Sequence, residues 1–204
     1  MGTHRMHGRL PWLSLDDLNP QAREVYDSIT GGDRALQAAY RMVSEDGRLE
    51  GPFNSMLYSP ELGDALQSLG SALRFKTTLG DREREIAVLT LAASLQSDFE
   101  WYAHEAVGSL VGLSNTEILS IKKGHAAITF SPTEELTHAA TLELICDRQL
   151  SDDILSTMVI EVGYTGVQEL ISLVGYYELL DLLMRVWRTP LPEGINSPFI
   201  VAEP

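Results

Sequence analysis

The sequence predicts an all-α protein, a single-domain helical bundle, and three observations support this prediction. Residues 86–95 (IAVLTLAASL) are apolar on nearly every side, which is typical of a helix buried on all its faces. The segments Ser114–Glu117 (SNTE) and Ser131–Glu134 (SPTE) have the S-x-x-E pattern of a helix capping box. No segment alternates apolar and polar residues cleanly enough to indicate a strand.

The remaining helices are predicted from their ends and their periodicity. Asn19 and Pro20 are typical of an N-cap and a first helical position, and the helix that they begin is expected to stop at Gly31-Gly32. A helix that begins at Ser59-Pro60 carries four leucines on one face, namely Leu62, Leu66, Leu69 and Leu73. Further helices are expected over residues 97–112, 114–123, 151–162 and 166–188, and from Ser131 onward.

Three regions follow from this pattern. Residues 1–18 form an extended N-terminal segment, residues 19–188 the helical domain, and residues 189–204 a C-terminal tail. The tail has three prolines in the ten residues after Thr189, so it cannot be helical throughout. Its apolar residues Phe199, Ile200 and Val201 are expected to pack on the body of the protein or on a neighbouring subunit.

Composition narrows the classes of partner and compartment. The 204 residues carry a formal net charge of -14, which disfavours binding to nucleic acid or to an anionic membrane surface. The single cysteine, Cys146, cannot form a CxxC pair or a Cys-rich zinc site, and it is expected to be buried and inert. Without a signal peptide or a long apolar run, we expect a soluble, cytoplasmic protein.

The window from Ser97 to His104 contains the main candidate site. On a helix, Ser97, Glu100 and His104 fall within about 60° of one another, because each residue turns about 100°. A histidine beside a carboxylate at i, i+4 spacing can carry protons near neutral pH. A second interpretation remains open, because Ser97-x-x-Glu100 also has the pattern of a capping box.

Glu85 is the second candidate, since it lies near Val88, Leu89 and Ala92 on the helical wheel. Apolar surroundings would suit a carboxylate that donates or accepts protons. Alternatively, Glu85 is an exposed first-turn residue that stabilises the helix dipole, with Arg82 and Arg84 as surface charges.

The other histidines give weaker signals. His125 and His138 have no second ligand at metal-binding spacing, and no H-E-x-x-H motif is present, so no metal site is predicted. His4 and His7 lie in an N-terminal segment that is expected to be mobile.

Four motifs follow one another along the chain: Asp81–Ile86 (DREREI), Glu100–Glu105 (EWYAHE), Gly112–Ser114 (GLS) and Leu173–Tyr177 (LVGYY). In this order and spacing, across residues 50 to 190, they resemble the carboxymuconolactone decarboxylase / alkyl hydroperoxidase D-like family. The resemblance implies an all-helical fold of the alkyl hydroperoxidase D-like type. It also implies homo-oligomers, commonly trimers or hexamers, with sites near subunit contacts.

The peroxidase branch of this family has a glutamate, then a CxxC pair, then a histidine. Glu85, Ser97, Glu100 and His104 stand at these four positions, so both motif cysteines are replaced. Because the thiolate nucleophile and the resolving thiol are missing, the resemblance does not support thiol-peroxidase chemistry through this motif.

The resemblance therefore implies a lyase or isomerase, decarboxylase-like and independent of cofactors, that acts on a small carbonyl- or lactone-bearing carboxylic acid. His104 is the expected general acid/base, Glu100 its orienting or relay partner and Glu85 a second proton carrier. Ser97 is expected to donate a hydrogen bond to substrate or only to cap its helix. The substrate anion would contact one of three basic residues, Arg74, Lys76 or Arg82. The alternatives are a non-catalytic ligand-binding or assembly protein and, more remotely, a peroxidase acting through Cys146.

Overall fold

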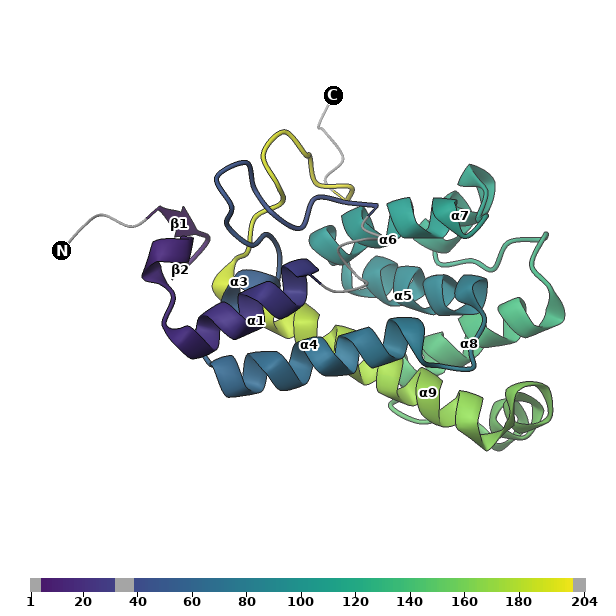
Figure 1. The fold of residues 1–204 in the computed structure, drawn as a ribbon. Coiled ribbons are helices and arrows are strands. Elements are labelled where there is room, and N and C mark those ends of the chain that lie inside the picture. Colours follow the sequence, from purple (N-terminus) through teal and green to yellow (C-terminus); the bar gives the residue numbers. More distant parts are fainter. Residues whose placement is uncertain (1–4, 32–38, 200–204) are drawn as a thin grey trace, which may run out of the picture. The chain divides into compact units, whose positions relative to one another are not determined.

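The computed structural model describes residues 5–31 and 39–199. The chain forms two compact units, here called the N-terminal unit (residues 1–72 and 180–197) and the central unit (residues 73–179 and 198–204; Figure 1). Sequence predictions at His4, Gly32, Ile200 and Val201 lie outside the described residues. The predicted all-α class is confirmed, since the described residues contain helices and one two-stranded sheet.

The small sheet belongs to the N-terminal unit. Strands β1 (Met6–His7) and β2 (Leu10–Pro11) pair antiparallel, with His7 opposite Leu10. Strands of two residues are too short to produce a detectable alternation, so the sequence did not indicate them. Gly8 in the turn has a φ of 70°, and a Cβ there would overlap the carbonyl oxygen of Arg188. The absence of a side chain lets the turn approach the end of the last helix.

The N-terminal hairpin is held in place, and its histidine is buried. The amide of Arg9 donates a hydrogen bond of 2.6 Å to the carbonyl oxygen of Trp187. His7 is only 2% exposed and stacks on Trp12 with ring centroids 4.6 Å apart. Burial lowers the pKa of His7 to about 4, so this imidazole is neutral at physiological pH. The expectation that His7 lies in a mobile segment is therefore wrong, because the hairpin packs His7 against Trp12.

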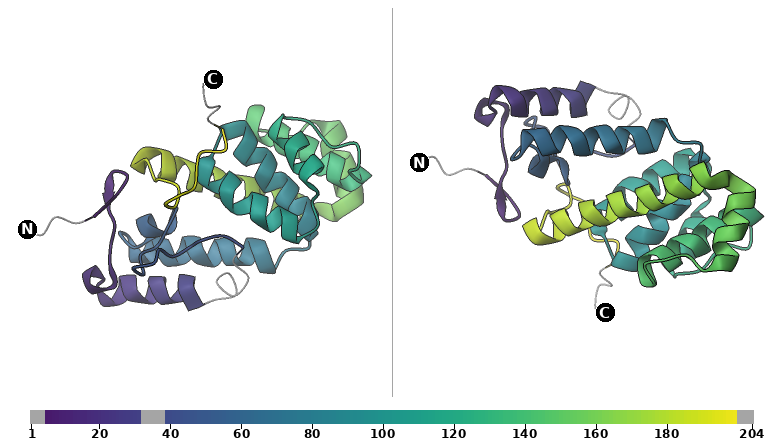
Figure 2. Two further views of the ribbon diagram at one scale, coloured as in Figure 1. Left: turned by 90° about the horizontal axis from the view of Figure 1, so that it is seen from above. Right: turned by 90° about the horizontal axis from the view of Figure 1, so that it is seen from below.

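Helices of the N-terminal unit follow the hairpin. They are the 3-10 helix η1 (Leu15–Asp17), α1 (Pro20–Gly31), the short α3 (Phe53–Met56) and the first part of α4 (Pro60–Phe75). Asn19 caps α1 as predicted, because its Oδ1 accepts a hydrogen bond of 2.8 Å from the amide of Ala22. Figure 2 shows α1 lying along α4, and Gln67 of α4 donates a hydrogen bond to Ser28 of α1.

The predicted leucine face of α4 is only half correct. Leu66 and Leu73 are buried, but Leu62 is 58% and Leu69 is 42% exposed. Gly63 is buried instead, and a Cβ there would overlap the backbone carbonyl of Met56. The close backbone approach at this glycine rotates the buried face away from Leu62.

The central unit is built around α5 (Asp81–Leu95), which contacts three further helices (Figure 1). These are α6 (Asp98–Leu110), α7 (Asn115–Lys122) and α8 (Pro132–Cys146). Every residue of α5 from Arg84 to Ala92 is buried, which confirms that this helix is enclosed on all sides. The predicted capping boxes at Ser114 and Ser131 are both present.

The last helix, α9 (Asp152–Trp187), is interrupted at Gly163, which has a φ of 70° and a ψ of 173°. Two helices, 151–162 and 166–188, were predicted, and the interruption falls at the expected place but occupies a single residue. Figure 2 shows the change of direction near this point. A conformation of this kind is accessible to glycine without steric cost. No helix within the described ranges is long and apolar enough to cross a membrane.

Cys146, in contrast to the prediction, is exposed. It is the last residue of α8, and Leu142 and Ile145 beside it are only half-buried. The apolar face of α8 therefore does not extend far enough to cover the thiol.

Arg82 was expected to be a surface charge or a substrate contact. It lies in the first turn of α5 and binds glutamates in the first turns of α7 and α8. Its Nε donates a hydrogen bond of 2.5 Å to Glu134 and its Nη2 one of 2.9 Å to Glu117. Its Nη1 donates one of 2.5 Å to the carbonyl oxygen of Gly112. Burial opposes ionisation of Glu117, but hydrogen bonds from Ser114 and Arg82, among others, outweigh it and hold the pKa of Glu117 at about 2.

This network predicts a specific acid sensitivity. The folded-state pKa of Glu117 lies below its ordinary value of 4.5, so its stabilising contribution is complete above pH 4.5 and disappears as the pH falls to about 2. We expect Arg82→Ala to lower the free energy of unfolding at pH 7 and to flatten its decline between these pH values. Urea unfolding at several pH values measures both effects. Arg23→Ala is the control, because the Arg23 side chain is exposed, where it pairs with Asp27 and lies over the Tyr26 ring. An unchanged pH slope in Arg82→Ala would contradict the prediction.

Candidate active site

Three of the four predicted site residues meet in the interior of the central unit. Glu85 of α5 lies against His104 of α6, with 2.6 Å between Oε2 of Glu85 and Nδ1 of His104. Glu100, one turn before His104, places its Oε2 3.7 Å from Nε2 of the same ring. Two carboxylates therefore flank the two nitrogens of one imidazole.

The three side chains are shielded from solvent. Glu85 is 1%, His104 is 2% and Glu100 is 3% exposed. The interpretation of Glu85 as an exposed first-turn carboxylate is therefore wrong. The contact of α5 with α6 encloses this end of α5, which a reading of the helix alone does not reveal. Burial makes the interactions among these groups stronger than they would be in water.

Ser97 is the N-cap residue of α6, but its side chain makes no capping hydrogen bond. Its own amide donates a hydrogen bond of 2.8 Å to the carbonyl oxygen of Ala92 in α5. Between the two helices, Gln96 has a left-handed φ of 52°, which makes a tight turn. Because that turn already satisfies the Ser97 amide, Glu100 is left to face His104. The capping-box interpretation of Ser97 and Glu100 is wrong.

This difference between serines predicts two different mutational effects. At α8, Ser131 caps its helix, since its Oγ accepts a hydrogen bond of 3.2 Å from the amide of Glu134. We expect Ser131→Ala to lower the free energy of unfolding by about 0.5–2 kcal/mol. Ser97→Ala removes no capping hydrogen bond, so we expect it to lower the free energy of unfolding by less than Ser131→Ala does. Urea titrations of both variants test this, and a larger loss in Ser97→Ala would contradict it.

Tyr177 of α9 completes the cluster, and sequence reasoning missed it as a site residue. Its ring meets that of His104 edge-on, with centroids 5.0 Å apart and an interplanar angle of 90°. Burial raises the pKa of Tyr177 well above its ordinary value of 10, and Glu100 and Glu85 raise it further against the opposing effect of Arg74. The phenol therefore stays protonated and can donate a hydrogen bond. The only sequence signal was its place in the LVGYY motif.

Two buried arginines supply positive charge in this part of the central unit. Nε of Arg84 lies 3.7 Å from Oε1 of Glu85, and its Nη2 donates a hydrogen bond of 2.7 Å to Asp81. Arg84 is only 8% exposed, so its prediction as a surface charge is wrong. Arg74 is equally buried and acts electrostatically on Tyr177. Of the three candidate anion contacts, Arg74 acts on Tyr177, Lys76 is exposed, and Arg82 pairs with Glu117 and Glu134.

His138 of α8 is also buried in the central unit, and its contacts indicate a structural role. Thr90 Oγ1 donates a hydrogen bond of 2.7 Å to the carbonyl oxygen of Ile86 and lies 2.8 Å from Nδ1 of His138. This contact between the hydroxyl and Nδ1 holds the His138 ring against α5. Burial lowers the pKa of His138, with a further contribution from His125. In the part of the chain that the structure describes, no group of three or more His, Cys, Asp or Glu is arranged to hold a metal ion.

No family model and no curated protein matches the sequence. Solved structures do resemble it. A cysteine-to-alanine variant of the debrominase Bmp8, in complex with 2,3,4-tribromopyrrole, is 8% identical with a TM-score of 0.70 over 95% of both chains. Apo Bmp8 is 11% identical with a TM-score of 0.67, covering 89% of this chain and 91% of that one.

A third similar structure is described as an alkylhydroperoxidase AhpD core, an uncharacterized peroxidase-related protein from Ralstonia eutropha JMP134. It is 15% identical with a TM-score of 0.72, covering 93% of this chain and 94% of that one. At these identities the likeness concerns the fold alone. It confirms the fold that the sequence motifs imply: the chain has the alkyl hydroperoxidase D-like fold.

Proposed function

We propose that this protein is a cofactor-independent lyase or isomerase that acts on a small carbonyl- or lactone-bearing carboxylic acid by proton transfer. The observation that carries the proposal is the buried His104 ring with a carboxylate at each nitrogen. Proton transfer by a positioned histidine contributes about 10²–10⁴-fold to a reaction rate. One structural neighbour is named a debrominase, which supports a catalytic use of this fold.

The distances suggest a division of roles among the three residues. The 2.6 Å contact lets Nδ1–H of His104 donate to Glu85, which fixes the ring and leaves Nε2 to exchange the reacting proton. In this proposal Glu100, at 3.7 Å from Nε2, relays protons between the ring and a substrate or solvent. The sequence prediction made Glu100 either the orienting or the relay partner and Glu85 a second proton carrier. The distances favour Glu85 for orientation and Glu100 for relay.

A decarboxylation illustrates the chemistry that such a site can perform. In a β-keto acid, the bond between the α-carbon and the carboxylate carbon breaks and CO₂ leaves. The electron pair forms an enolate, and the α-carbon then takes a proton from Nε2 of His104. A proton from solvent, passed by Glu100, restores the ring. The same proton transfer without loss of CO₂ would isomerise a carbonyl compound.

The enolate oxygen also needs stabilisation. Tyr177 lies against His104 and its phenol stays protonated, so it is suited to donate a hydrogen bond to this oxygen. The buried Arg74 acts on the same part of the cluster and would favour a negatively charged substrate despite the acidic chain. In this proposal Ser97, buried at the start of α6, contributes a hydrogen bond to substrate.

A turnover assay tests the proposal. Purified protein is incubated in D₂O with carboxymuconolactone-type and simple β-keto acid substrates, and product mass and CO₂ release are followed. Product formation, or deuterium on the carbon next to the carbonyl, would support proton-transfer catalysis. Substrate binding without either change would instead support a non-catalytic ligand-binding role on this fold. Peroxide reduction coupled to loss of the exposed Cys146 thiol would support the peroxidase alternative.

A further inference from the structure

The N-terminal unit contains a polar cavity of about 350 Å³ that the proposed chemistry does not use. Its walls come from the N-terminal hairpin segment, the loop before α3 and the tail after α9. The residues that carry the argument are Arg5, Trp12, Arg41, Asp46, Glu50 and Glu193. A cavity of this size lies at the lower end of the range for small-molecule sites.

Glu50 is the buried polar group of this cavity. It is 2% exposed, and its Oε1 lies 3.5 Å from Nε of Arg41. That distance suits an ion pair but is longer than a good hydrogen bond. No hydrogen bond from residues 5–31 or 39–199 is found at this carboxylate. Buried carboxylates normally accept several hydrogen bonds, and among the described surroundings of Glu50 the cavity is where a donor can enter.

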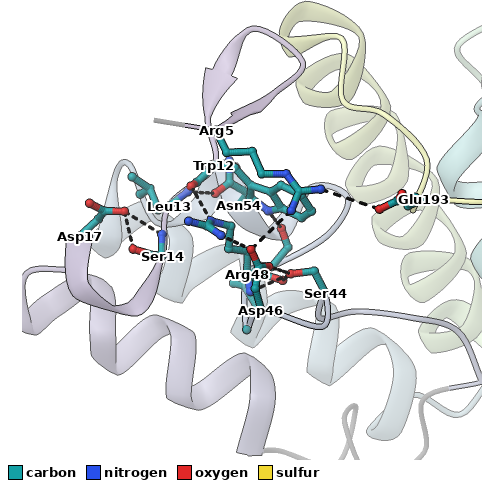
Figure 3. A network of polar contacts seen from close by, with 12 residues as sticks. Arg5, Trp12, Leu13, Ser14, Asp17, Ser44, Asp46, Arg48, Asn54 and Glu193 are labelled. Carbon is teal, nitrogen blue, oxygen red and sulfur yellow. Dashed lines mark hydrogen bonds and ion pairs between the residues drawn. The ribbon is translucent and has the colours of Figure 1, made fainter. Parts of the chain in front are cut away.

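The charges around the cavity leave a negative surplus. Arg5 reaches Asp46 at 3.4 Å and Glu193 at 3.9 Å (Figure 3). Arg48 pairs with Asp46 from outside the lining. Among the described residues, these and Arg41 make three guanidinium groups against four carboxylates, the fourth being Glu45. Burial raises the pKa of Glu50, and the positive charges of Arg41 and Arg5 oppose this effect. One additional cation would balance the site.

The aromatic wall also suits a cation. The guanidinium carbon of Arg5 lies 4.6 Å from the centre of the Trp12 ring. Trp12 is fixed by a hydrogen bond of 2.7 Å from its Nε1 to the carbonyl oxygen of Leu49. Its backbone carbonyl accepts a second one of 3.0 Å from Arg48. The Trp12 ring is therefore held in position beside Arg5, whose side chain is half-exposed.

We propose that this cavity binds a small organic monocation, an amine whose ammonium group donates to Glu50 and whose body lies along Trp12. The site is separate from the His104 cluster and does not depend on the proposed reaction.

Calorimetric titration of the full chain with three probes of similar shape tests the proposal. The probes are phenethylammonium, the neutral 2-phenylethanol and the anionic 3-phenylpropionate. We expect only the cation to bind, and Glu50→Gln to weaken its affinity by about tenfold or more, since a charged hydrogen bond is lost. Glu24→Gln is the control, because it removes one carboxylate from an exposed position on α1.

Absence of cation binding, equal binding of all three probes, or an equal loss in Glu24→Gln and Glu50→Gln would each overturn the proposal. If Glu50→Gln does not fold, the affinity of Glu193→Gln tests the proposal, because this side chain is 90% exposed and we expect its replacement to leave the fold intact. We then expect a roughly two- to fivefold weaker affinity, and an unchanged affinity would overturn the proposal.

Discussion

Replacing His104 by glutamine is expected to lower kcat/KM by about 10²–10⁴-fold for any substrate that the wild type converts. Glutamine keeps a polar side chain next to Glu85 but cannot exchange a proton. Alanine is the poorer choice, because it would leave the Glu85 carboxylate buried without its 2.6 Å partner, at a cost of about 3–5 kcal/mol if that carboxylate stays charged.

Parallel kinetics on two further variants make this result specific. Glu85→Gln should retain the hydrogen bond to Nδ1 but lose the negative charge beside the ring, so we expect its main effect on kcat rather than on KM. Glu105→Gln removes a carboxylate from the next position of the same helix, which is exposed, and should leave kinetics unchanged. Circular dichroism confirms that each variant is folded. Full activity in folded His104→Gln would refute the assignment of His104.

Of the variants proposed to test stability, Trp101→Ala is expected to lower the free energy of unfolding most, by about 3–5 kcal/mol. Trp101 is 0% exposed and belongs to the core cluster of the central unit with Ile86, Leu89 and Ile121. Phe199 of the tail meets its ring edge-on at 5.5 Å, and Nζ of Lys122 lies 5.4 Å from its centroid. Removal of the indole would leave a cavity that this close packing cannot fill by relaxation.

A matched tryptophan provides the comparison. Trp187, at the end of α9, is only half-buried, so Trp187→Ala should cost less. Urea unfolding followed by far-ultraviolet circular dichroism avoids the loss of a fluorescent reporter. Equal destabilisation in the two variants would contradict the view that the Trp101 cluster is the core of the central unit. The Trp101–Phe199 contact also agrees with the expectation that the tail packs on the body, at the one residue of its apolar triplet that the structure describes.

Predictions from the sequence succeeded where a few neighbouring residues determine the structure. The capping boxes at Ser114 and Ser131 and the cap at Asn19 each depend on residues within one helical turn. The burial of α5 was evident from its lack of a polar face. In the candidate site, the approach of Glu100 to His104 followed from i, i+4 spacing alone.

The sequence by itself therefore determined the helical class, most helix ends and the approach of Glu100 to one nitrogen of the His104 ring. Only the tertiary structure decided that Glu85 contacts the other nitrogen of this ring and that Tyr177 packs edge-on against it. It likewise decided that Arg82 pairs with a glutamate of another helix. It also decided that Ser97 does not cap, and that Cys146 is exposed. The physical reason is that these outcomes depend on which helix faces pack together. Contacts between residues distant in the sequence arise from that packing and have no short-range signature.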